Sequence, residues 1–170
     1  VPNLTKVPEF FPSNIIDIEY LFYFATNFNQ DISMWDVSNV TNMNGMFHHT
    51  FAFDQDISMW DTSSVTDMGS MFLNAEAFNQ PLNSWNVSNV TNMGNMFNTA
   101  TTFNQDISNW NVSNVTDMNG MFYEANSFNQ PLNSWNVSNV TDMTYMFTDA
   151  TAFDQDISMW DTSNVLGMSY

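Results

Sequence analysis

The chain has 170 residues, of which 18 are Asp or Glu and only one is Lys or Arg, so its formal net charge is −17. This balance excludes nucleic acid as a partner, because no row of cationic side chains is available to neutralise phosphates. The 44% of hydrophobic residues suffice for a core and argue against disorder, while the absence of Cys excludes disulfides and thiolate metal sites.

An unbroken 25-residue period runs through the chain and predicts one solenoid domain over residues 1–170. A degenerate first repeat occupies 3–27, five full repeats fill 28–152, and a truncated repeat covers 153–170, about seven repeats in all. The last repeat stops in the middle of a unit, so we expect the segment to be part of a longer chain. No apolar run of about eighteen residues is present, so we expect no membrane insertion.

Spacing within one unit predicts its local structure. Leu82, Trp85 and Val87 have the spacing of a leucine-rich strand, which we place at about residues 85–87. The next apolar residues recur at i, i+3, i+4 and i+7 over 91–100, one face of a short helix with Thr91 as its N-cap. The expected fold class is an α/β repeat solenoid, a leucine-rich-repeat-like coil with one short parallel strand and one short helix or 3-10 turn per 25-residue repeat.

The motif V-T-x-M-x-x-M-F-x-x-A-x-x-F-N-Q at residues 90–105 resembles the BspA-like leucine-rich repeat of bacterial surface proteins and lipoproteins. That resemblance covers nearly the whole chain. It implies an extracellular or cell-surface location, a role in adhesion or in binding macromolecules, and no catalytic residues to transfer.

Outward-facing residues between the apolar positions of the expected strands form the predicted partner-binding surface. Their amide, hydroxyl, carboxylate and Met side chains suit a protein or glycan ligand. Because these positions repeat nearly unchanged, a solvated cover for the backbone is the competing interpretation. The predicted residues are Ser33, Met34, Asp36, Ser58, Met59, Asp61, Asn83, Ser84, Asn86, Ser108, Asn109, Asn111, Asn133, Ser134, Asn136, Ser158, Met159 and Asp161.

No cofactor is expected, and calcium is the one metal that the carboxylate pattern suggests, because hard cations need several oxygen ligands. No glycine-bearing calcium loop accompanies these carboxylates. The calcium candidates are Asp54, Asp56, Asp61, Asp154, Asp156 and Asp161.

Two further features bear on function. His48 and His49 interrupt the repeat once and have no plausible metal-ligating or catalytic partner, so we expect surface histidines and no enzyme activity. The uniform repeats also admit a second hypothesis, in which the protein is a subunit of an extracellular fibre or surface layer and self-associates end to end.

Overall fold

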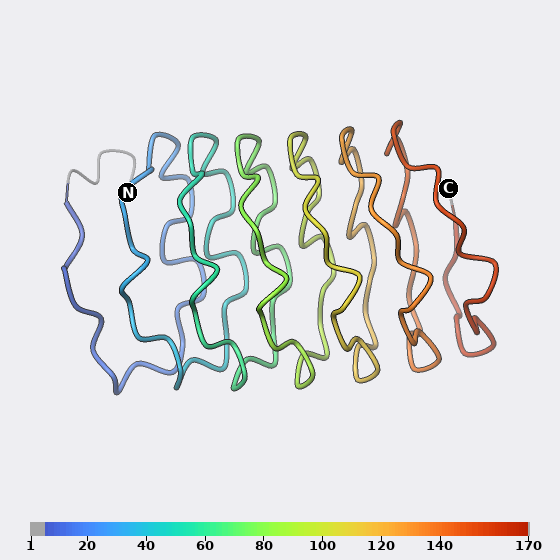
Figure 1. The fold of residues 1–170 in the computed structure, drawn as a ribbon, viewed down its shortest axis with the longest axis horizontal. Helices are drawn as coiled ribbons and strands as arrows, with labels where there is room; N and C mark the ends of the chain where they lie inside the picture. Colours follow the sequence, from blue (N-terminus) through green and yellow to red (C-terminus); the bar gives the residue numbers. More distant parts are fainter. Residues whose placement is uncertain (1–5, 170) are drawn as a thin grey trace.

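The computed structural model describes residues 6–169 as a coil that advances by one turn every 25 residues. Figure 1 shows the coils side by side along the long axis, from the blue N-terminal end to the red C-terminal end. Neighbouring coils meet at isolated parallel bridges, one per coil, and no residue between 6 and 169 forms a helix or a strand of several residues. The bridges are Asp17↔Asn42, Asn42↔Asp67, Asp67↔Asn92, Asn92↔Asp117, Asp117↔Asp142 and Asp142↔Gly167.

The predicted α/β leucine-rich-repeat-like fold is therefore wrong, and the expected helix over 91–100 shows why. Met93 and Met96 are joined by a backbone hydrogen bond from the N–H of Met96 to the carbonyl of Met93, and Ala100 pairs with Phe97 in the same way. These are tight turns of four residues, each closed by a hydrogen bond between its first and last residue. Asn95 and Thr99 have φ of 56°, the left-handed region, which no right-handed helix accommodates.

Such left-handed residues recur at the same two positions of each coil, as at Tyr20 and Phe24 in the first and Gly120 and Glu124 in the fifth. Because the backbone reverses its hand at each of them, alternate N–H groups point along the coil axis. Thus the N–H groups of Met93, Asn95 and Phe97 donate to carbonyls of the next coil at 2.9, 2.6 and 2.9 Å. Backbone hydrogen bonds therefore hold the coils together without a strand on this side of the coil, which comprises residues 91–100 and their equivalents. We call each side of the coil a limb.

Side chains replace the backbone ladder on the opposite limb, where a strand was expected at residues 85–87. The indole Nε1 of Trp110 donates to the carbonyl of Leu82, and the amide of Asn109 donates to the carbonyl of Asn83. The amide of Gln105 likewise donates to the carbonyl oxygen of Asn79 at 2.9 Å. Each of these bonds links one coil to the coil before it.

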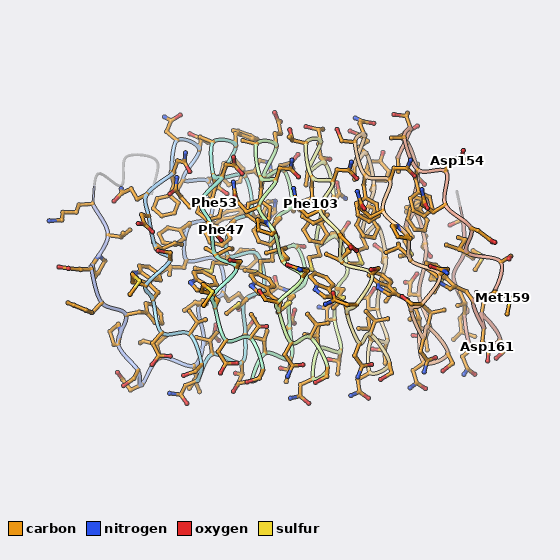
Figure 2. The ribbon with its side chains drawn as sticks, in the orientation of Figure 1. Phe47, Phe53, Phe103, Asp154, Met159 and Asp161 are labelled. Atoms are coloured by element: carbon orange, nitrogen blue, oxygen red, sulfur yellow. The ribbon has the colours of Figure 1, made fainter. Side chains whose placement is uncertain are left out.

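Stacked aromatic side chains fill the interior. Phe97 lies 5.6 Å from Phe72 and 5.7 Å from Phe122, with nearly parallel rings, and 4.0 Å from Phe103, six residues later in the chain. Figure 2 shows Phe47, Phe53 and Phe103 inside the coil, as their complete burial requires. Each interior coil thus buries its apolar side chains against its two neighbours, which makes stability a property of the stack.

The prediction that Thr91 is the N-cap of a helix is wrong. The Thr91 hydroxyl donates to the carbonyl of Thr66 at 3.3 Å, and Thr116 repeats the contact with Thr91 at 3.2 Å. Asp67 and Asp117 accept backbone N–H groups from Gly69 and Asn119 two residues later. These side chains close turns and join coils.

Candidate binding surfaces

The predicted partner-binding residues lie together on one limb of the coil, although they stand on turns rather than on a strand. Around the central unit, Leu82, Trp85 and Val87 point inward and are at most 4% exposed, whereas Asn83 and Asn86 are exposed. The same alternation recurs from coil to coil, so the eighteen predicted residues form a continuous strip that we call the outward face. All of them are exposed or half-buried.

Many polar side chains of the outward face form hydrogen bonds within the coil or with a neighbouring coil. Asp36 accepts hydrogen bonds from both the N–H and the hydroxyl of Ser38, at 3.1 and 2.6 Å. These bonds hold the pKa of the Asp36 carboxyl below its ordinary value, and those from Ser63 do the same for Asp61. The hydroxyl of Ser134 donates to the carbonyl of Ser108. The carboxylates of this face therefore stay ionised to low pH.

Methionine is the exception to this self-sufficient pattern. Met34, Met59 and Met159 are 81%, 84% and 82% exposed, and Figure 2 shows Met159 at the edge of the last coil, pointing away from it. Ser84 and Ser134 take the same position in other coils. The fold therefore does not need Met at this position, and its exposed thioether is available to a partner.

The calcium candidates do not converge. Asp54 accepts hydrogen bonds from the N–H of Asn79 and the amide of Gln80, while Asp56 accepts the N–H of Ser58. Asp154 and Asp161 lie at opposite edges of the last coil in Figure 2. Across residues 6–169, no three His, Cys, Asp or Glu side chains are placed to hold a metal ion.

An open pocket of about 320 Å³ is lined by apolar side chains of the last two described coils, among them Met146, Phe147 and Trp160. Elsewhere in the stack the next coil occupies the corresponding space, as Phe122 does against Phe97. The pocket is thus part of the stacking surface between coils, and we assign it no ligand.

A second surface was missed by the sequence reasoning, which expected His48 and His49 to be ordinary surface residues. Both are half-buried and stand within a cluster of rings that we call the aromatic patch. Burial lowers the pKa of His48 to about 4, and the neighbouring His49 adds to the effect. The patch consists of Tyr20, Tyr23, Phe24, His48, His49 and Phe51.

A helix long and apolar enough to cross a membrane is missing from the described part of the chain. The family model described as "Mycoplasma protein of unknown function, DUF285" matches residues 3–105 and again residues 80–170. Neither a curated protein nor a solved structure matches the chain. The resemblance to BspA-like leucine-rich repeats is therefore wrong, because the matching family is another one and the described coils lack the strands and helices of that repeat.

Proposed function

The chain belongs to the family described as "Mycoplasma protein of unknown function, DUF285", and we propose that it is a binding module of the cell surface or extracellular space. It holds a macromolecular partner, a protein or a glycan, on its outward face. The proposed activity is adhesion or binding, and no reaction is assigned to it.

The observation that carries this proposal is the exposure of Met34 and Met59 in consecutive coils, each beside an exposed carboxylate, Asp36 or Asp61. An apolar side chain left more than four-fifths exposed contributes nothing to the core, and a serine suffices at this position in other coils. Flexible thioethers adapt to a partner's surface, and adjacent carboxylates add directional hydrogen bonds. This combination favours a protein partner over a glycan.

The rigidity of the outward face supports the same role. Coil-to-coil hydrogen bonds such as Ser84 Oγ to the Ser58 carbonyl, and Asn109 to the Asn83 carbonyl, fix the positions of the side chains before a partner arrives. A preorganised surface loses little conformational entropy on association. Binding spread along several coils then accumulates affinity from many small contacts.

Labelled protein applied to immobilised extracellular-matrix proteins and to a glycan array tests the proposal. The double variant Met34→Ser and Met59→Ser, which copies the residues of other coils, is expected to weaken saturable binding at least tenfold. The matched control Thr102→Ala and Ser127→Ala, at exposed positions outside the outward face, should leave it unchanged. Equal binding by both variants would show that the partner does not bind to the outward face. The absence of saturable binding by the wild type would overturn the proposal.

The hypothesis of a fibre or surface-layer subunit that assembles end to end is the alternative proposal. Sedimentation velocity over a wide concentration range separates the two. Open-ended polymers that grow with concentration would favour the fibre hypothesis. A monomer at every concentration would favour the binding module.

A further inference from the structure

Side chains vary from repeat to repeat along one strip of the coil. At the equivalent positions that begin with Phe24, the chain has His49, Asn74 and Thr99 in the next coils, and the backbone keeps φ between 56° and 61° at all four. The positions of Tyr23 and Phe51 vary in the same way. Since the backbone does not change with the side chain, the fold does not dictate which side chain stands there.

Within this variable strip, the first two described coils gather all six rings of the aromatic patch. Phe24 stacks on His49 at 4.2 Å with an interplanar angle of 10°, and Tyr23 meets His48 edge-on at 4.9 Å. Phe51 extends the cluster, 5.6 Å from His49. The rings come from the blue end of the chain in Figure 1, and among the ring contacts of residues 6–169 none joins side chains of this strip in the later coils.

The patch combines partly exposed rings with buried polar atoms that have no hydrogen-bond partner. Tyr23, Phe24 and Phe51 remain 42%, 43% and 37% exposed, where later coils place Asn98, Thr99 and Thr101. Among the described residues, only three buried side-chain polar atoms have no hydrogen-bond partner, and two of them are the Nδ1 atoms of His48 and His49. Buried polar atoms without a hydrogen-bond partner are concentrated at functional sites. Tyr20 has a structural role as well, because a Cβ at Gly45 would overlap its ring.

We propose that the aromatic patch is a binding site for a basic peptide segment, whose Lys or Arg side chains lie against its exposed rings. The site is distinct from the outward face and does not depend on its function. Aromatic rings attract cations through their quadrupole, so the partly exposed rings of Tyr23, Phe24 and Phe51 suit an ammonium or guanidinium group.

Charge complementarity selects the basic peptide over other occupants. The chain carries a net charge of −17, and Glu76 lies close enough to His49 to influence its protonation. Because the pKa of His48 is about 4, its ring is uncharged at neutral pH and does not repel a cation. The field of the whole molecule concentrates basic segments near the surface, and the rings then retain them.

Two measurements on the same protein test the proposal, with a synthetic deca-lysine peptide as the probe. Fluorescence anisotropy of the labelled peptide gives the affinity. Proton NMR of the histidine Hε1 signals gives the place, since His48 and His49 are the only histidines of the chain and both belong to the patch. We expect both signals to shift saturably, with the dissociation constant that anisotropy gives.

The patch variant Tyr23→Asn, Phe24→Thr and Phe51→Thr copies the residues of the fourth coil and leaves the net charge unchanged. We expect it to lose at least tenfold in affinity for deca-lysine. The control Tyr123→Asn and Tyr145→Asn removes two aromatic residues from the same strip in later coils and should bind like the wild type. Equal affinities of wild type and patch variant, or unmoved histidine signals, would show that the general negative field alone attracts the peptide and would overturn the proposal. So would a neutral oligosaccharide that shifts the histidine signals where deca-lysine does not.

Discussion

The indole Nε1 of Trp110 donates a hydrogen bond to the carbonyl oxygen of Leu82, 3.0 Å away and 28 residues earlier in the chain. The same bond recurs from Trp60 to Ile32, from Trp85 to Ile57 and from Trp135 to Ile107. Tryptophan in this column therefore contributes both its buried ring and a donor to the preceding coil.

Replacement of Trp110 separates the two contributions. Trp110→Phe keeps an aromatic ring but removes the donor, and we expect a loss of about 1–2 kcal/mol, because the Leu82 carbonyl keeps its bond from the N–H of Trp85. Trp110→Ala also empties the core and should cost about 3–5 kcal/mol. Urea unfolding followed by circular dichroism measures both. A Phe variant as stable as the wild type would mean that the inter-coil hydrogen bond is energetically neutral.

The side chain of Asn104 is predicted to stabilise the fold through its oxygen, as a hydrogen-bond acceptor, and not through its amide N–H groups. Its Oδ1 accepts the backbone N–H of Asn129 at 2.9 Å and the Gln130 amide at 3.0 Å. Asn104→Ala leaves two half-buried donors without this partner and should cost about 1–3 kcal/mol. Asn104→Asp keeps the acceptor, as Asp54 does at the equivalent position, and should cost less than half as much in the same unfolding assay. Similar losses for both variants would contradict this account.

The period and the buried columns could be predicted from the sequence, but the local structure could not. Met93, Met96, Phe97 and Ala100 have the spacing of a helix face, and two successive four-residue turns give the same spacing. What separates the two structures is the hand of Asn95 and Thr99, and a β-branched Thr is a poor indicator of a left-handed residue. Spacing alone therefore could not distinguish a helix from turns.

The outward face was predicted from the sequence, whereas the aromatic patch was not. The outward face followed from the alternation of buried and exposed positions, because that alternation survives whether the limb is a strand or a series of turns. The aromatic patch was missed because its rings come from two coils and are brought together only by stacking, as Phe24 and His49 are. Side-chain variation at one position of a constant repeat is the signal that could have found it.

Thr99 is predicted to be a site of avoidable strain. Its φ of 56° is unfavourable for a β-branched residue, and Asn74 occupies the equivalent position of the preceding coil with φ of 57°. Thr99→Asn should raise the free energy of unfolding by about 0.5–1 kcal/mol. The control Thr101→Asn, two residues away and outside the set of positive-φ residues, should change stability by less than about 0.5 kcal/mol. No gain at Thr99 would show that the lost contact of its hydroxyl with the Asn98 side chain offsets the relief of strain.

The histidines of the aromatic patch are predicted to make stability depend on pH. The pKa of His48 in the folded chain is about 4, against an ordinary value of 6.5, and burial also lowers the pKa of His49. The unfolded chain therefore binds more protons between these values, so the free energy of unfolding should fall as pH decreases from about 6.5 to about 4.5. After allowance for solvent screening of half-buried rings, the expected fall is about 1–2 kcal/mol.

The double variant His48→Leu and His49→Asn, which copies Leu73 and Asn74 of the next coil, isolates this effect. The carboxyls with shifted pKa values, such as Asp36 and Asp142, have them lowered, so their contribution is present above their unfolded value and lost only as pH falls further. Chemical unfolding at pH 7, 6 and 5 should therefore give a sloping stability for the wild type and a flat one for the variant. Equal slopes in the two proteins would mean that other groups control the dependence and that the half-buried rings of His48 and His49 titrate as they do in the unfolded chain.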